Sequence, residues 1–352
     1  MLEETLHKIA LEVNRFVNGS SPGRPGSSRR FGRIFTLAYW IVLACPASAS
    51  ADEELGRIAT ASNQFGGSFI DVESPELLAR LPGASEDPRL RELWVSGMRL
   101  EQKEELVASA EQYQRIVELR PGASLTYWRI ARNYWRKSES LSFDAKKERI
   151  EYFEIARDWA QRGIDADPEC GECMLWKFVA MGRLATTKGL LSAVRTVSEM
   201  GSLLERGIAL QPTYADSPNN TALGNLYYAG AVFNRVVPDS LWVSWIIGVR
   251  GDKEQSLDYI RKAVAISDAR VDYRVELGAV LLCLGVEKED SGRLAEGAEV
   301  LRGARQMKPY LSTDYLDLGY AQKLIESPGL ACGFSRDGFI DIAEVIESRG
   351  DG

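Results

Sequence analysis

The chain has 352 residues, of which 45% are hydrophobic, and its 43 Lys and Arg against 50 Asp and Glu give a net charge of −7. This length can bury a substantial core in one large domain or two smaller ones, and the acidic balance argues against a general attraction for nucleic acid or anionic lipid. His7 is the only histidine, and it lies in a segment that we expect to be removed. The mature chain would therefore lack Ser-His-Asp and Cys-His catalysis and every histidine-ligated metal site.

The N-terminal segment is predicted to direct export. Basic residues ending in Arg29-Arg30 precede Ile34–Cys45, a twelve-residue apolar run that is short for a membrane span. Pro46 ends this run, and the small residues up to Ala51 suit a signal peptidase. We expect residues 1–51 to be a signal peptide with a long basic region, and the mature protein to be periplasmic.

Two variants of this prediction stay open. Val42-Leu43-Ala44-Cys45 resembles a bacterial lipobox, which would make Cys45 the attachment site of a lipid anchor. Ser28-Arg29-Arg30 begins like a twin-arginine signal, but Gly32 and Arg33 stand where that signal has large apolar residues. Ordinary secretion is the preferred interpretation.

The mature chain is predicted to be helical along most of its length. Residues 52–88 form an irregular lead-in with one short helix, residues 89–326 a helical repeat domain, and residues 327–352 a tail with a short helix. Leu90–Leu119 predicts two helices. Gly251–Gly278 shows the repeat most clearly, because its apolar residues recur every three or four positions and predict an amphipathic helix, a tight turn and the start of the next helix.

Four prolines and one aspartate mark the ends of successive repeats. They follow one another at intervals of 47, 44, 56 and 41 residues: Pro121, Pro168, Pro212, Asp268 and Pro309. A proline just past a helix cannot continue it and so favours a turn into the next unit. Small residues precede these markers by five positions in four units, namely Gly163, Gly207, Ala263 and Ala304.

These features resemble the tetratricopeptide repeat, in which a large residue, Leu-Gly, Tyr, Ala and Pro follow in order. Examples are Leu223-Gly224-x2-Tyr227 and Leu277-Gly278-x2-Leu281. The resemblance implies an all-α, right-handed α-solenoid of paired helices. Every interval exceeds the ideal unit of about 34 residues, and we expect the surplus between paired helices, at 138–149, 184–197, 233–251 and 287–294.

Residues 125–310 also resemble a more specific group. The segments TYWRIARNY, LLERGIALQP, ALGNLYYAGAVFNRVVP and DKEQSLDYIRKAV occur in the order seen in the regulator of microtubule dynamics family and its bacterial relatives. The order is also similar to that of the periplasmic T-component of TRAP transporters. The first resemblance implies only the fold for an exported protein, and the second implies an oligomeric, solute-binding accessory.

The cysteines allow several interpretations. Cys170-Gly171-Glu172-Cys173 has a spacing that suits an inert structural pair, a local disulfide in an oxidising compartment, or redox or metal chemistry. Zinc would need two more ligands, from Cys283, Cys332 or carboxylates. Cys283 lies in an apolar run and is predicted to be a buried core thiol. We predict neither a metal nor a cofactor.

A binding groove is predicted on the face of the first helices that lines the concave side of a tetratricopeptide array. Aromatic and arginine side chains there would suit a peptide or small ligand, although packing by an insertion is the alternative interpretation. The groove residues are Trp128, Arg132, Trp135, Lys177, Asn225, Tyr228 and Tyr320, whereas Tyr127, Tyr134 and Trp176 are predicted to be core. The apolar insertion Val236–Val249 is expected to cover this groove, to form an oligomer contact, or to lie at a membrane interface.

Together these features predict an exported, non-enzymatic scaffold that recognises a protein or peptide partner along its groove. The alternatives are a periplasmic accessory that binds a small organic solute for a TRAP-type transporter and, less favoured, a thiol oxidoreductase at Cys170 and Cys173. No nucleic-acid partner and no membrane span in the mature chain are expected, and an oligomer is compatible with the sequence.

Overall fold

The computed structural model describes residues 87–188, 196–217, 219–237, 239, 249–309, 314–335 and 338–339. All of these except Phe339 fall in one compact unit, Phe65–Gly338. The predicted signal peptide, the lipobox cysteine Cys45 and nearly all of the lead-in lie outside the described residues. So does most of the apolar insertion Val236–Val249.

The described residues contain eleven α-helices, one 3-10 helix and four very short strands. The α-helices are α4 (Pro88–Gln102), α5 (Leu106–Leu119), α6 (Ser124–Glu139), α7 (Lys146–Ala166), α8 (Gly171–Lys188), α10 (Val197–Ala209), α11 (Ala222–Val236), α13 (Lys253–Ile266), α14 (Val271–Glu287), α15 (Ser291–Ala304) and α16 (Asp314–Glu326). The remaining elements are the 3-10 helix η1 (Pro328–Gly333) and the strands β1 (Ala215–Ser217), β2 (Asn220–Thr221), β3 (Phe334–Ser335) and β4 (Gly338–Phe339).

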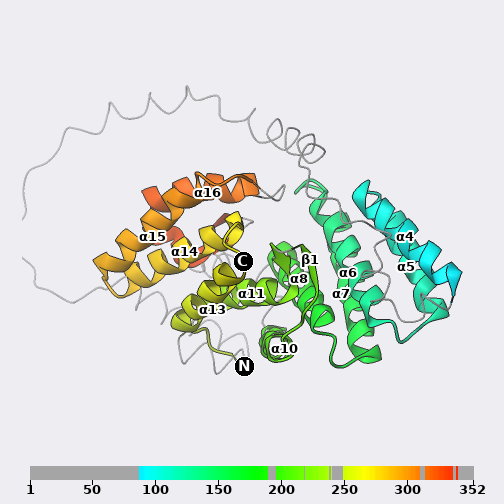
Figure 1. Cartoon of the computed structure of the whole chain (residues 1–352). Helices are drawn as coiled ribbons and strands as arrows, with labels where there is room; N and C mark the ends of the chain where they lie inside the picture. The colour runs from blue at the N-terminus through cyan, green and yellow to red at the C-terminus, as the bar shows by residue number, and fades with distance from the viewer. Residues whose placement is uncertain are drawn as a thin grey trace, which may run out of the picture. The chain divides into compact units, whose positions relative to one another are not determined.

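The helices pack in sequence as adjacent pairs, which confirms the predicted all-α repeat array. Five hairpins follow one another: α4/α5, α6/α7, α8/α10, α11/α13 and α14/α15. The second helix of each hairpin also contacts the first helix of the next, and α15 contacts α16. Figure 1 shows these neighbours in chain order.

Local signals in the sequence set the helix boundaries. Asp252 begins α13 by accepting a hydrogen bond from the Gln255 N–H through its side chain, and Asp290 begins α15 in the same way. Such N-caps satisfy amide groups that have no partner within the helix. In the stretch Gly251–Gly278, Leu257, Ile260 and Ala263 of α13 are buried as the amphipathic pattern predicts.

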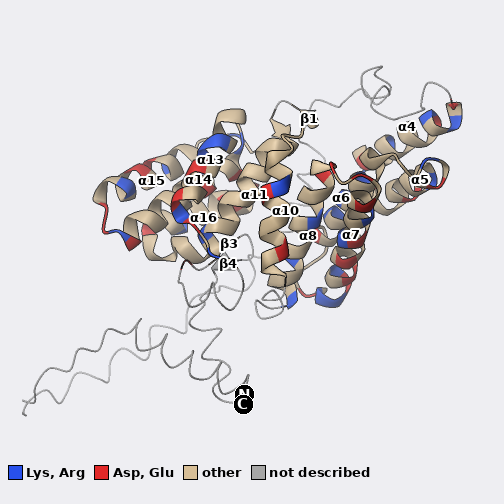
Figure 2. Ribbon diagram, turned by 90° about the horizontal axis from the view of Figure 1, so that it is seen from below, with Lys and Arg blue, Asp and Glu red and all other residues tan. Residues whose placement is uncertain are grey.

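Charged residues of both signs follow the exposed positions of α7, as Figure 2 shows. Its buried residues are instead mostly apolar or small and include Phe153, Ala156, Ala160 and Gly163. This division between a solvated face and a packed face is the one expected for the second helix of a repeat.

Glycine is required where paired helices approach most closely. A Cβ at Gly163 of α7 would lie 2.6 Å from the Cys173 sulfur and 2.8 Å from the Tyr127 Cβ. A Cβ at Gly278 of α14 would lie 2.5 Å from Leu301. Both positions match the small residues that the repeat pattern requires, because any larger side chain would push the helices apart.

The expected surplus between paired helices is only partly present as loops. A turn of three residues joins α14 to α15, so the predicted insertion at 287–294 is wrong, and the longer interval comes from α14, which has 17 residues. Half of 138–149 is helical, because α6 ends at Glu139 and α7 begins at Lys146, and the other half forms the connection between them. Helix length therefore accounts for part of the irregular repeat spacing.

The last elements enclose α14. Helices α11, α13, α15, α16 and η1 all contact it, and fourteen of its residues are buried, from Val271 through Gly285. This explains the continuous apolar run in α14, since a helix surrounded on all sides needs no polar face.

Candidate functional site

Trp128 does not line an open groove. Its side chain is 2% exposed and belongs to the core cluster between α6, α8 and α11. The ring packs edge-on against Tyr214, with ring centroids 4.6 Å apart. Tyr214 comes from the connection between α10 and α11, just before β1, and not from any of the predicted insertions. This connection occupies this part of the predicted groove, and Trp128 acts as a packing residue.

Arg132 is buried as well, in an ionic network with Glu101 and Arg129. Glu101 Oε2 accepts from Arg129 Nη1 at 3.0 Å and from Arg132 Nη2 at 2.9 Å. The Arg132 guanidinium lies over the Trp128 ring at 5.0 Å. The network joins α4 to α6, and a charge so enclosed is stable only because it is paired.

Arg129 is the residue at the centre of this network, and the sequence analysis missed it. It is 1% exposed, lies 4.8 Å from the Trp94 ring and 4.9 Å from the Trp128 ring, and donates to the Tyr214 hydroxyl. Burial, followed by the charge of Glu101, raises the pKa of the neighbouring Tyr113 phenol well above its ordinary value of 10.0. Its position directly after Tyr127 and Trp128 is the sequence signal that could have identified it.

The other predicted groove residues are held by intramolecular partners. Lys177 is 9% exposed, and its ammonium group donates to Gln161 of α7 and Glu199 of α10. The Tyr273 hydroxyl donates to Asn225 Oδ1 at 2.8 Å, and Tyr228 stacks on the Tyr273 ring with centroids 5.3 Å apart. These residues bind neighbouring helices together.

Tyr320 contacts Phe334 near the C-terminus, with ring centroids 5.4 Å apart. It therefore packs against the last described elements. The predicted groove residues do not converge on a single site.

Trp135 and Trp176 form an aromatic pair that stays partly accessible. They come from α6 and α8, the first helices of successive hairpins, and their ring centroids are 5.5 Å apart. Both residues are half-buried, although Trp176 was predicted to be core. The Trp135 Nε1 atom is buried and has no hydrogen-bond acceptor in the described part of the chain.

An ion pair lies one to two helical turns beyond these rings on the same two helices. Arg183 of α8 donates to the Glu139 carboxylate of α6 through Nε at 2.7 Å and Nη2 at 3.1 Å. Glu139 also accepts from Arg149 Nη2 at 3.3 Å. The pair fixes α6 against α8, so the two tryptophans are presented by a rigid surface.

Cys170 and Cys173 form a disulfide at the start of α8. Cys170 is 4% exposed and Cys173 is 0% exposed. Pro212 covers the connecting Gly171, where an added Cβ would lie 3.1 Å from the proline ring. A redox centre needs an accessible sulfur, so this geometry favours a structural bridge.

Cys283 requires a correction. It is buried as predicted, at 0% exposed, but it is not a free thiol, because it forms a disulfide with Cys332. Cys283, Cys332 and Glu287 are the one group of potential metal ligands found close together among the described residues. With both sulfurs in the disulfide, the group offers no thiolate to a metal.

No described helix is both long enough and apolar enough to cross a membrane. A surface hollow of about 520 Å³ lies between α4 and α5 and is lined mainly by polar and charged side chains, including Arg89, Glu92, Gln112 and Arg115. It brings together none of the predicted site residues.

A comparison with protein families agrees with one of the resemblances. The family model of regulator of microtubule dynamics protein 1-3 matches residues 95–237, from within α4 to the residue after α11. The comparison with curated proteins finds no match. The chain is therefore similar to this family over its first three hairpins and α11, while the tetratricopeptide and T-component resemblances stay predictions.

Proposed function

We propose that this protein is an exported, non-enzymatic binding module that recognises a protein or peptide partner at the Trp135–Trp176 pair. The observation that carries the proposal is the half-buried aromatic pair on successive helices, flanked by the Arg183–Glu139 ion pair. Aromatic rings and arginine dominate the energetics of protein interfaces. The family match supports the helical framework but says nothing about the partner.

Two disulfides support the export part of the proposal. Disulfides form and persist in oxidising compartments and are rare in the cytosol. Together with the predicted signal peptide, they favour a periplasmic location. The buried Cys170–Cys173 bridge also favours a binding role over a thiol oxidoreductase, because neither sulfur is open to a substrate.

The test is partner capture from a periplasmic extract by the purified protein and by a Trp135→Ala/Trp176→Ala variant. We expect the variant to lose capture while it keeps its helical circular dichroism. Trp159→Ala is the matched control, since Trp159 of α7 is a half-buried tryptophan that packs against Tyr127 and Arg162 elsewhere. Equal capture by the double variant and wild type would refute the assignment.

Native mass spectrometry of the mature chain distinguishes the solute-binding alternative. A bare monomer is expected for a partner-binding module. A bound small organic molecule together with a discrete oligomer would instead favour the transporter accessory.

A further inference from the structure

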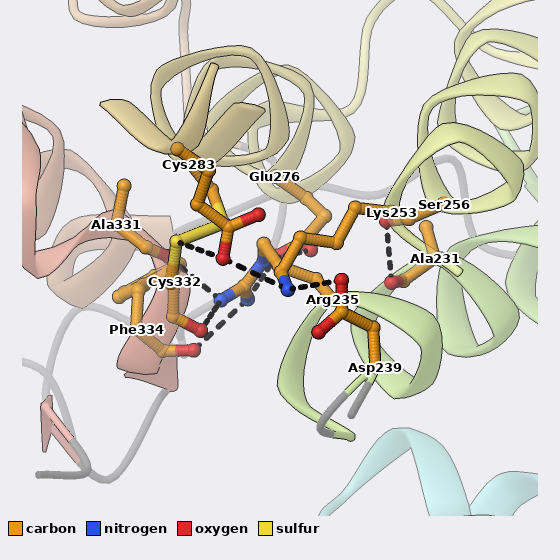
Figure 3. Close-up of a disulfide and its surroundings, with 11 residues drawn as sticks. Ala231, Arg235, Asp239, Lys253, Ser256, Glu276, Cys283, Ala331, Cys332 and Phe334 are labelled. Atoms are coloured by element: carbon orange, nitrogen blue, oxygen red, sulfur yellow. Dashed lines mark hydrogen bonds and ion pairs between the residues drawn. A yellow bond between two sulfur atoms is a disulfide. The ribbon is translucent and has the colours of Figure 1, made fainter. Parts of the chain in front are cut away.

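The C-terminal segment Pro328–Ser335 is docked against α11 and α14 as a peptide ligand would be. Arg235 of α11 donates from Nη1 to the carbonyl oxygens of Ala331 at 2.9 Å and Cys332 at 3.1 Å, and from Nη2 to that of Phe334 at 2.9 Å. Figure 3 shows the guanidinium directed at these carbonyls. One buried side chain thus binds three carbonyl groups of the segment.

Glu276 of α14 makes this arrangement possible. Its carboxylate accepts from Arg235 Nε at 2.7 Å and from Nη2 at 2.9 Å, and the two side chains are 1% and 2% exposed. Pairing offsets the cost of burying the cation. The guanidinium still has N–H groups for the carbonyls, because it carries five donors in a planar fork.

Two side chains of the segment are buried in the contact. Ala331 is 0% exposed and Phe334 is 4% exposed. The Phe334 ring meets Tyr320 edge-on, and the Arg235 guanidinium lies 5.5 Å from its centroid. The site therefore accepts a 3-10 turn that carries a small residue and, three positions later, a phenylalanine in extended backbone.

The Cys283–Cys332 disulfide closes this contact covalently. It links α14 to η1, as Figure 3 shows. Glu287 lies close to both sulfurs, and its carboxylate accepts from Lys253 Nζ at 2.9 Å. Cys332 is half-buried, whereas Cys170, Cys173 and Cys283 are each no more than 4% exposed. A dithiol can therefore reach the sulfur of Cys332 more readily than the other three.

We propose that α11 and α14 form a second, peptide-binding site that Pro328–Ser335 occupies as an internal ligand. Reduction of Cys283–Cys332 opens this site to another peptide that presents the same 3-10 turn, small residue and phenylalanine. The recognition group is Arg235, held by Glu276. The site is separate from Trp135 and Trp176 and does not depend on their role.

The redox step requires a dithiol as reductant. Its first thiolate attacks the sulfur of Cys332, forms a mixed disulfide and releases Cys283 as a thiolate, which takes up a proton. The second thiolate of the reductant then attacks the mixed disulfide and releases Cys332 as a thiolate, which is also protonated. Two cysteine thiols and one oxidised, cyclic dithiol result.

The experiment uses a fluorescent peptide, SPGLASGFS, which copies residues 327–335 with serine in place of cysteine. Its anisotropy is measured with three full-chain proteins: oxidised wild type, wild type reduced with dithiothreitol, and Cys332→Ser. The tethered segment competes at an effective concentration of roughly millimolar. We therefore expect saturable binding at about that concentration to the reduced and Cys332→Ser proteins, and none to the oxidised protein.

Matched controls separate recognition from unfolding. The peptide SPGLASGAS is expected to bind about tenfold or more weakly, because it lacks the buried phenyl ring. In the reduced protein, Arg235→Lys is expected to lose peptide binding while its helical content is retained, because lysine lacks the planar set of donors of a guanidinium. Arg293→Lys, at a partly exposed position of α15, is the control and is expected to retain peptide binding. Cys332→Ser leaves Cys170–Cys173 intact, so it also excludes an effect of that bridge.

Three results would overturn the proposal. The first two are equal peptide binding by oxidised and reduced protein, and equal binding of the two peptides. The third comes from hydrogen exchange of the amides of residues 329–335, which must accelerate on reduction if the segment is released. Equally slow exchange in both states would show that the disulfide does not hold the segment in its site.

Discussion

Arg235 is predicted to be among the most destabilising positions to substitute in the described unit. Arg235→Met would leave the Glu276 carboxylate, which is 2% exposed, without its cation. It would also remove the three hydrogen bonds that Arg235 donates to backbone carbonyl oxygens. Breaking a buried ion pair by removing one partner costs about 3–5 kcal/mol. For a unit of this size, such a loss would lower the melting temperature by roughly 5–10 °C.

The assay is urea unfolding followed by circular dichroism, with Arg293→Met as the matched control. Arg293 pairs with Glu254 on the surface, where the two side chains are 27% and 47% exposed, and such pairs contribute at most about 1 kcal/mol. The double variant Arg235→Met/Glu276→Met should lose less than the sum of the single variants, because no lone charge remains buried. Equal destabilisation by Arg235→Met and Arg293→Met would refute the reasoning.

Three further predictions concern packing, pH and cross-linking. Gly163→Ala should lower the free energy of unfolding by about 1–3 kcal/mol, because the new Cβ would clash with Cys173 and Tyr127. Gly303→Ala, with nothing within 4 Å of its Cβ, should raise it by up to about 1 kcal/mol. Equal effects of the two variants in thermal melts would contradict the close approach at Gly163. The raised pKa of Tyr113 keeps its phenol neutral in the folded state, so its contribution is fully present below the ordinary pKa of 10.0 and is lost as the pH rises further. Tyr113→Phe should therefore remove about 1 kcal/mol of the stability lost between pH 10 and pH 11. An unchanged alkaline unfolding curve would show that Tyr113 ionises normally. Loss of Cys283–Cys332, whose cysteines are 49 residues apart, should cost about 4 kcal/mol, against about 2 kcal/mol for Cys170–Cys173 with a separation of 3. Denaturant titrations of the two double-serine variants compare these values, and the reverse order would contradict the loop-closure account.

Helical architecture was predictable because its signals are local. The apolar spacing of Leu257, Ile260 and Ala263 places them on one face of α13 whatever surrounds that helix. Other signals are local too. A proline beyond a helix end and Asp252 at a helix start each set a helix boundary through residues a few positions away. A glycine between paired helices follows from a geometry that recurs in every repeat. The apolar run around Cys283 likewise predicted that this residue is buried, whereas the enclosure of α14 on all sides emerged only from the packing of its neighbours.

The candidate site depended on contacts that a repeat pattern does not encode. Trp128 lies on the face that a regular array would leave open, and Tyr214, from the segment between α10 and α11, covers it. Arg129 meets the same tyrosine 85 residues away. Periodicity predicts which face of a helix a residue occupies, but not which irregular segment packs against that face.

The cysteines show the same division between near and distant contacts. Cys170 and Cys173 are one helical turn apart, so their proximity follows from local geometry, and a disulfide between them was foreseeable. Cys283 meets Cys332 only because η1 returns to α14, where Arg235 and Glu276 hold the segment in place. Residues three or four positions apart share a helix face through covalent geometry, whereas residues 49 apart meet only when buried charge and apolar packing make the return of the chain favourable.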